Sequence, residues 1–232
     1  MHEEGFVSNR NGNHRDYSAV TQLSDWSTDA SSDILALQRV TAGPAADRLE
    51  NIIRLLLAEL NLDVNSEHFR DTPARAAQFY REFTQGYAAK PVEILKTFSS
   101  QSDGLVVVSN IDFYSLCPHH LLVYGGKLHF AYVPNGQIVG VSKIPRLVHA
   151  LAARPVVQEA LVADIADAFM SVVKPLGCAV KAIGRHDCVA GRGVKCPSMV
   201  MTTVVTRELF QERESLCREF GQAVAAETKC DR

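Results

Sequence analysis

Residues Lys127-Leu128-His129-Phe130-Ala131-Tyr132-Val133 lead through Pro134-Asn135-Gly136 into Ile138-Val139-Gly140-Val141. A mostly apolar run that is bounded by Pro, Asn and Gly is typical of a β-strand that ends in a turn. Strands joined by such a short turn run in opposite directions. This stretch therefore predicts that the chain is built on antiparallel β-structure.

Strand-like and helical patterns extend outward from this stretch in a fixed order. The chain has helices first, then antiparallel strands, a pair of helices, more strands and a last helix, which predicts an α+β fold rather than alternating α/β units. Pro155 is expected to open the second helix of the pair. The further strands are expected at 105–108, 178–183 and 199–206, and the helices at 49–60, 71–86, 142–153, 155–169 and 212–225.

The composition predicts one packed domain preceded by a polar tail. The chain has 232 residues, of which 47% are hydrophobic and 22% are charged, as in globular proteins. Residues 1–40 are rich in Ser, Asn, Asp, Arg and His and have no periodicity, so this tail is expected to be disordered. Residues 41–232 are expected to form the folded domain, with helices at its N-terminal side.

Charge and cysteine content narrow the class of protein further. The net charge of −2 argues against bulk binding of nucleic acid. No apolar run reaches the roughly 18 residues of a membrane helix, and no signal segment follows Met1, so a cytoplasmic protein without membrane contact is expected. The six cysteines are scattered and are expected to be reduced thiols or metal ligands.

The strongest chemical feature is Cys117-Pro118-His119-His120, in an expected loop after a strand. A tight turn can bring a Cys and a His three positions apart to the same ion, and thiolate with imidazole suits zinc. His186-Asp187-Cys188 offers a second Cys, and a Cys/His/Cys set would leave one coordination position open for water. The alternative is a buried free cysteine beside hydrogen-bonded histidines. His129 and His149 are interpreted as structural.

A second feature is a set of basic residues outside the apolar faces. Lys143 and Arg146 lie at a helix start, where the helix dipole also favours an anion such as a polyphosphate. Arg192 lies between two glycines, and Arg75 follows a helix start. The alternative for each is ordinary surface charge. Glu159 could accept two hydrogen bonds from guanine, or could simply complement a helix dipole.

These features, in this order, resemble the GTP cyclohydrolase I family over roughly residues 48–225. The resemblance is specific because many motifs occur in register. They are Asp71-Thr72-Pro73-Ala74-Arg75, Cys117-Pro118-His119-His120-Leu121, Gly126-Lys127, Ala131-Tyr132-Val133-Pro134, Val141-Ser142-Lys143-Ile144-Pro145-Arg146, Val157-Gln158-Glu159, His186-Asp187-Cys188 and Arg192-Gly193.

The resemblance implies a tunnelling fold, in which an antiparallel sheet is backed by helices and subunits form a ring, as a homodecamer with sites at subunit boundaries. It implies a Zn2+ cofactor and GTP as substrate. The implied zinc ligands are Cys117, His120 and Cys188, and the implied catalytic residues are His119, His186 and Ser142. The implied purine-binding residues are Gln158 and Glu159, and those for the triphosphate are Lys143, Arg146 and Arg192, with Arg75 from a neighbouring subunit.

The implied reaction opens the imidazole ring of GTP, releases formate and rearranges the ribose to give 7,8-dihydroneopterin triphosphate, the first step of tetrahydrofolate and pterin synthesis. Alternatives are a member that stops at a ring-opened intermediate or makes another pterin, and a non-catalytic nucleotide-binding regulator. A zinc nucleoside deaminase is not expected, because its H-x-E and P-C-x-x-C motifs do not occur.

The chain departs from the family pattern at a few positions. Pro118 stands where Glu is usual, Ile183 replaces an acid that could have steadied protonated His186, and Lys195-Cys196-Pro197-Ser198 is unusual. These departures affect the surroundings of the implied ligands and not the ligands themselves.

Overall fold

The structure, a computed structural model, describes residues 45–227 and divides at Phe79/Tyr80 into two compact units, which are taken separately below. The expected tail at 1–40 lies outside the described residues. In the first unit, α2 spans Ala45–Glu59 and α3, which spans Thr72–Glu82, begins. Both helices were predicted, since the apolar residues of α2 recur at helical spacing and Pro73 follows the start of α3.

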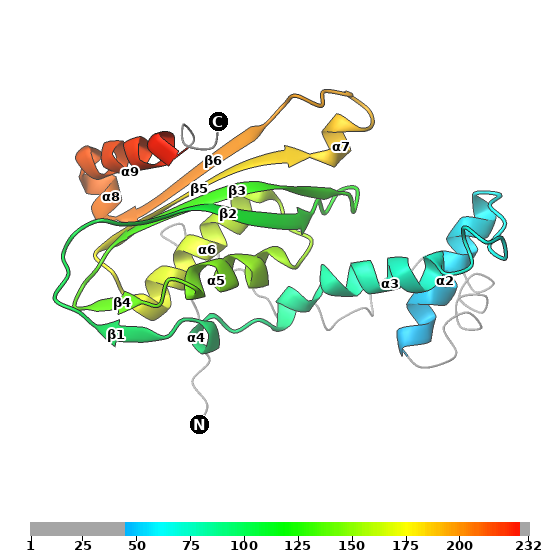
Figure 1. Cartoon of the computed structure of the whole chain (residues 1–232), viewed down its shortest axis with the longest axis horizontal. Coiled ribbons are helices and arrows are strands. Elements are labelled where there is room, and N and C mark those ends of the chain that lie inside the picture. The colour runs from blue at the N-terminus through cyan, green and yellow to red at the C-terminus, as the bar shows by residue number, and fades with distance from the viewer. Residues whose placement is uncertain (1–44, 228–232) are drawn as a thin grey trace, which may run out of the picture. The chain divides into compact units, whose positions relative to one another are not determined.

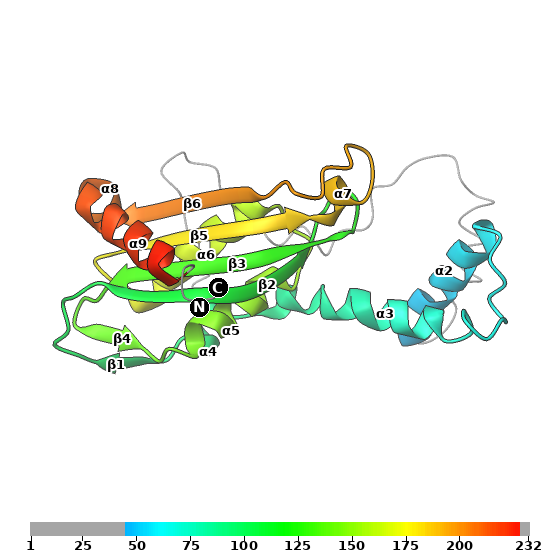
Figure 2. The same ribbon diagram turned by 45° about the horizontal axis from the view of Figure 1, so that its top comes forward.

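The second unit is built on a four-stranded antiparallel sheet (Figures 1 and 2). The strands lie in the order β2-β3-β5-β6, and each pair of neighbours is antiparallel. This confirms the α+β class and the antiparallel sheet. The strands are mostly longer than their apolar runs, because paired strands continue through polar and glycine residues. Their bounds are Val106–Leu116 for β2, Val123–Val133 for β3, Gly177–His186 for β5 and Met201–Glu208 for β6.

The turn at 134–136 forms, with Gly136 in the left-handed region at φ 73°, but the strand that follows it leaves the main sheet. This strand, β4 (Gln137–Val139), pairs instead with β1 (Thr97–Ser99) in a separate two-stranded sheet. The Val139 N–H donates to the Tyr132 hydroxyl at 3.3 Å, which ties the short sheet back to β3.

Two helices cover one face of the main sheet, and two cover part of the other (Figure 1). The first face carries α5 (Lys143–Ala152) and α6 (Gln158–Val173), while α8 (Leu209–Glu212) and α9 (Glu214–Glu227) lie on the opposite side. Shorter helices complete the unit: η2 (Gln85–Ala88), α4 (Pro91–Ile94) and α7 (Asp187–Ala190).

The prediction that Pro155 opens α6 is wrong, because the helix begins three residues later. Pro155 forms a parallel bridge with Leu116 at the end of β2, and the Val156 N–H donates to the Leu116 carbonyl at 3.1 Å. This pairing holds residues 155 and 156 extended. Val157 then serves as the N-cap, so Gln158 and Glu159 are the first two helical residues.

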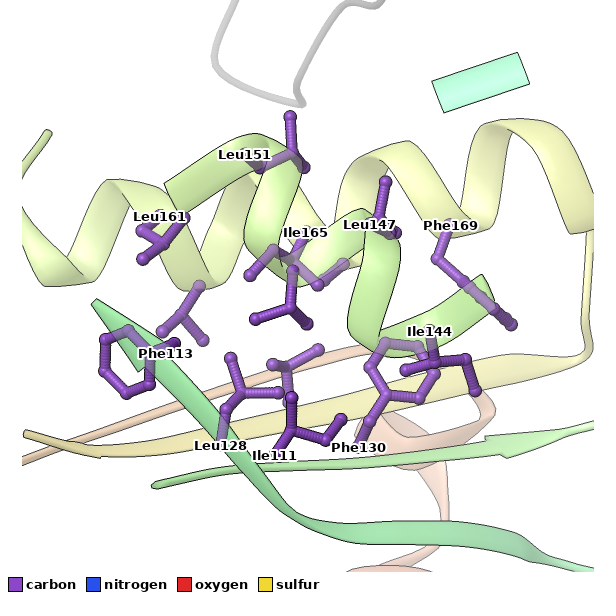
Figure 3. Close-up of a cluster of buried hydrophobic side chains, with 14 of the residues drawn as sticks. Ile111, Phe113, Leu128, Phe130, Ile144, Leu147, Leu151, Leu161, Ile165 and Phe169 are labelled. Atoms are coloured by element: carbon purple, nitrogen blue, oxygen red, sulfur yellow. The ribbon is translucent and has the colours of Figure 1, made fainter. Parts of the chain in front are cut away.

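The main core lies between the sheet and α5 and α6, where strand and helix side chains interdigitate (Figure 3). Leu128 and Phe130 of β3 and Phe169 of α6 are fully buried. Burial of each such side chain stabilises the folded state by about 1.5–3 kcal/mol relative to leaving it exposed. Successive side chains of a strand point to opposite faces. Cys178, Val180 and Ala182 of β5 belong to this core, so the even-numbered residues of β5 face α5 and α6.

Candidate active site

The candidate site lies at one end of the main sheet, where β2 and β5 finish and β3 begins. Cys117 follows the last residue of β2, and Cys188 lies in α7, directly after β5. The loop from Cys117 to Leu122 is a tight turn closed at its base, where the Cys117 N–H donates to the Leu122 carbonyl at 2.9 Å. The Cys117 carbonyl accepts from the N–H groups of His120 at 3.3 Å and Leu121 at 2.8 Å. The predicted turn therefore exists.

The three predicted zinc ligands come together at this end of the sheet. One ligand atom each from Cys117, His120 and Cys188 lies within 4.8 Å of the others, and the Cys117 Sγ is 3.8 Å from His120 Nδ1. Tetrahedral zinc, with bonds of about 2.0–2.3 Å, holds its ligand atoms roughly 3.5–3.8 Å apart. The three side chains therefore fit a zinc ion after small shifts, and their donor set leaves a fourth position open.

His119 and Arg192 border this cluster. His119 is exposed, and its Nδ1 lies 3.7 Å from the Cys117 Sγ. Burial, followed by the hydrogen bond and the charge of Cys117, raises the pKa of Cys188, while the positive charge of Arg192 acts in the opposite direction. Arg192 is exposed, and its charge reaches Cys188.

His186 is held in a row of side chains that crosses three strands. Ser115 of β2 pairs with Tyr124 of β3, which pairs in turn with His186, the last residue of β5. The rings of Tyr124 and His186 stack in parallel, with centroids 4.6 Å apart and planes 3° apart. Burial raises the pKa of Tyr124 to about 12, and its hydroxyl donates to the Val156 carbonyl at 2.8 Å.

Gln158 joins His186 from the first turn of α6. Its side chain is fully buried, and His186 Nε2 lies 3.2 Å from its Oε1. Its amide nitrogen donates to the Met201 carbonyl and the Thr203 hydroxyl, both at 3.0 Å. Both amide hydrogens are therefore used within the subunit, and the expected role of Gln158 at the purine stays a prediction.

Glu159, the next residue of α6, is exposed and lies beside the same histidine. Burial lowers the pKa of His186, and the negative charge of Glu159 opposes this shift. The exposed carboxylate of Glu159 is thus close enough to His186 to act on its charge. The expected role of Glu159 at the purine stays a prediction.

The remaining basic residues are not brought to this cluster within one subunit. The C-terminal end of α5 lies beside the site, since the Ser115 hydroxyl donates to the Arg154 carbonyl at 2.9 Å. Lys143 and Arg146 lie in the first turn of α5, a helix about 15 Å long. Ser142 is the exposed N-cap, and its side chain makes no capping hydrogen bond. The implied roles of Ser142, Lys143 and Arg146 at the substrate stay predictions.

Arg75 is described with the first unit. It lies on α3, its side chain is 75% exposed, and it forms an ion pair of 3.1 Å with Asp71. Its expected contribution to a neighbouring subunit stays a prediction.

The unusual residues affect the site less than expected. Ile183 lies three positions before His186 on β5, so the two side chains leave opposite faces of the sheet. An acid at position 183 would therefore lie on the opposite face of the sheet from His186, and the effect of Ile183 on the rate stays open to measurement. Pro118 is exposed in the turn.

Two residues of the site were not expected from the sequence. Ser115 and Tyr124 join it because the register pairs them with one another and with His186, and that register depends on how three strands pair rather than on any one of them. His129 and His149 are structural as expected. His129 Nδ1 accepts from the Asn110 N–H at 3.4 Å, and His149 Nε2 lies 2.9 Å from the Asp112 carbonyl.

Comparison with known proteins places these residues in a family. The family model of GTP cyclohydrolase I matches residues 49–225. The chain belongs to the GTP cyclohydrolase I family. It is 39% identical over 176 residues to GTP cyclohydrolase 1 of Campylobacter curvus, covering 75% of this chain and 93% of the relative. It is 40% identical over 174 residues to that of Methylococcus capsulatus, covering 74% and 94%.

A further curated relative covers a slightly smaller part of the chain at a similar identity. GTP cyclohydrolase 1 of Mycolicibacterium vanbaalenii is 42% identical over 167 residues, which cover 71% of this chain and 83% of the relative. Among solved structures, the archaeosine synthase QueF-Like in the apo form aligns with a TM-score of 0.38 and 18% identity. That overlap covers 46% of this chain and 95% of the other, and is too slight to carry an argument.

Family membership makes the chain an enzyme, a GTP cyclohydrolase I-type hydrolase. None of the helices between residues 45 and 227 combines the length and the apolar character needed to cross a membrane. The expected cytoplasmic location stays a prediction.

Proposed function

We propose that the enzyme hydrolyses the guanine imidazole ring of GTP with zinc, releases formate and rearranges the product to 7,8-dihydroneopterin triphosphate. The observation that carries this proposal is the position of the Cys117, His120 and Cys188 cluster beside a stacked, half-buried histidine, His186. A metal site with an open position and an adjacent proton-transfer group is what a zinc-dependent hydrolase uses.

Zinc would be held by Cys117, His120 and Cys188. Bound there, it would supply Lewis acidity and activate water for attack on C8 of the purine. His186 would give a proton to the purine and take one back, since imidazole can act in both directions near neutral pH. His119, exposed beside Cys117, would serve further proton transfers.

Glu159 would select guanine. Its exposed carboxylate can accept hydrogen bonds from N1–H and the 2-amino group, an arrangement that adenine cannot offer. A hydrogen bond to a charged group contributes about 1.5–3 kcal/mol. Arg192, close enough to act on the charge of Cys188, would hold an oxygen of the triphosphate.

The site would be completed between subunits of a tunnelling-fold ring, a homodecamer. The support is the position of Ser142, Lys143 and Arg146 at the far end of α5 from the cluster. A ring in which one subunit presents this end of α5 to the cluster of the next would unite the two halves. Arg75 would also act across a boundary, and Ser142 would assist the ribose steps.

The proposed reaction is the first step of tetrahydrofolate or pterin synthesis, and it is tested by identifying the product. Zinc-loaded enzyme is incubated with GTP, and formate and the nucleotide product are measured by mass spectrometry. Equal amounts of formate and dihydroneopterin triphosphate are expected. Accumulation of a ring-opened formamide would show that the enzyme stops early, and unchanged GTP would contradict the proposal altogether.

A further inference from the structure

We infer that Gln158 is a positioning residue that holds His186 through a hydrogen bond to Nε2, and that it does not bind the purine. This inference rests on the proposed function, since it assigns a task to His186. The carrying observation is a continuous chain of contacts that runs from the backbone of β6 through the Gln158 amide to the imidazole.

The orientation of the Gln158 amide is decided by its surroundings. The Met201 carbonyl can only accept a hydrogen bond, and it lies 3.0 Å from Nε2 of Gln158. The Thr203 hydroxyl, also at 3.0 Å, accepts the second hydrogen. A flipped amide would place two acceptor oxygens against each other in a fully buried position, which is costly. Oε1 of Gln158 therefore faces His186.

This orientation decides which ring nitrogen of His186 is available. An amide oxygen can only accept, so His186 Nε2, at 3.2 Å, must be the donor. The Tyr124 ring fixes the plane of the imidazole by stacking on it, with 3° between the planes. Nδ1 is then the nitrogen of His186 that is available to the substrate, and its lone pair has a set direction.

The packing around Gln158 supports a role within the protein. Gly184 of β5 lies next to the Gln158 side chain, and a Cβ at position 184 would come within 2.3 Å of the Gln158 Oε1. The glycine therefore makes room for the amide against the sheet. The neighbouring residue Glu159 is exposed and remains free to contact the base, so the two residues divide the tasks of orientation and recognition.

The test replaces Gln158 with Met, which has a similar length and makes no strong hydrogen bond, in the zinc-loaded enzyme. Gln211→Met is the matched control, because Gln211 also donates its amide to a β6 carbonyl, that of Thr206 at 3.0 Å, but from α8. For both variants the measurements are zinc content, kcat and KM for ring opening, the ratio of GTP to ITP use, and a crystal structure.

We expect Gln158→Met to lower kcat by about tenfold or more, the usual effect of removing a residue that orients an active-site histidine. The KM for GTP, the preference for GTP over ITP and the zinc content should stay unchanged, and the His186 ring should rotate away from Tyr124 in the crystal structure. Gln211→Met should match the wild type in every measurement.

A raised KM together with a weaker preference for GTP over ITP would mean that Gln158 binds the base, and would overturn the inference. An unmoved His186 ring with unchanged kcat would overturn it as well. If the wild-type enzyme does not act on GTP, the proposed function fails, but the ring orientation in the two crystal structures still decides the role of Gln158.

Discussion

Cys188 is the residue on which the candidate metal centre depends most. Cys117 and His120 share one short turn, whereas Cys188 arrives from the end of β5 and closes the set from the other side. Two ligands in a turn bind zinc weakly, and a third ligand completes the donor set of a catalytic site. The thiol of Cys188 is therefore the group whose removal tests the metal site most directly.

We predict that Cys188→Ser strongly lowers both the zinc content of the purified enzyme and its activity on GTP. Cys196→Ser is the matched control, because Cys196 is also a half-buried free thiol in the segment after β5. It should keep both zinc and activity. Elemental analysis of the two variants provides the measurement, and full zinc occupancy in Cys188→Ser would exclude the proposed ligand set.

The individual site residues could be predicted where chemistry alone identifies them. Cys117, His120 and Cys188 are rare residue types with metal-ligand spacing, and they converge as expected. The role of Gln158 could not be predicted, because it depends on which backbone carbonyls of β6 lie opposite its amide. An amide side chain has the same donors and acceptors in a binding site and in a buried network.

Strand β5 is the element that organises the site. Its register with β3 places His186 opposite Tyr124, and its pairing with β6 places Gly184 opposite Met201. The even-numbered residues of β5 face α6, and this face is occupied by Gln158. The sequence indicates that this segment is a strand, but the face presented to α6 depends on tertiary packing.

For β5 we predict that Gly184→Ala lowers kcat and leaves the zinc content unchanged. The new Cβ would come within 2.3 Å of the Gln158 Oε1, so the amide must move and release His186. Overpacking of this kind costs about 1–3 kcal/mol of stability. Thermal unfolding and steady-state kinetics with GTP provide the measurements.

Gly221→Ala is the control for this substitution. Gly221 lies within α9, and a Cβ there would meet nothing within 4 Å. Replacing glycine inside a helix with alanine stabilises it by roughly 0.5–1 kcal/mol, so the melting temperature should rise while kcat stays constant. If Gly184→Ala keeps the wild-type kcat, the proposed link from β5 through Gln158 to His186 is wrong.

The chain as a whole carries two halves of the proposed site that lie apart. The cluster and His186 are at one end of the sheet, and Lys143 is at the opposite end of α5. The sequence could predict both halves, since each has a motif, but not their separation. The length of α5 was predicted to within one residue at each end, but its direction across the sheet depends on tertiary packing.

For the oligomer we predict that two inactive variants complement each other. Chains with Lys143→Ala and chains with Cys188→Ala, co-expressed with different tags, should form mixed oligomers in which some sites combine two intact halves. Random pairing of equal amounts would restore roughly a quarter of wild-type activity. Activity of the doubly tagged oligomers on GTP provides the measurement.

The control for complementation pairs Lys143→Ala with Arg146→Ala. These residues share the first turn of α5, so every site in a mixed oligomer receives one damaged α5 end, and activity should not return. Restored activity in this control, or none in the first mixture, would contradict a site shared between subunits.

The position of the metal ligands also sets the order of events when the chain is made. Cys117 and His120 are synthesised well before Cys188, and β3 and both helices of the main core lie between them in the chain. Cys188 reaches its partners only when β5 has paired with β3 in the correct register, since a slip of one residue would turn its strand over. Tight metal binding therefore follows the pairing of β5 with β3, and it stabilises only the chain in which these strands have the correct register.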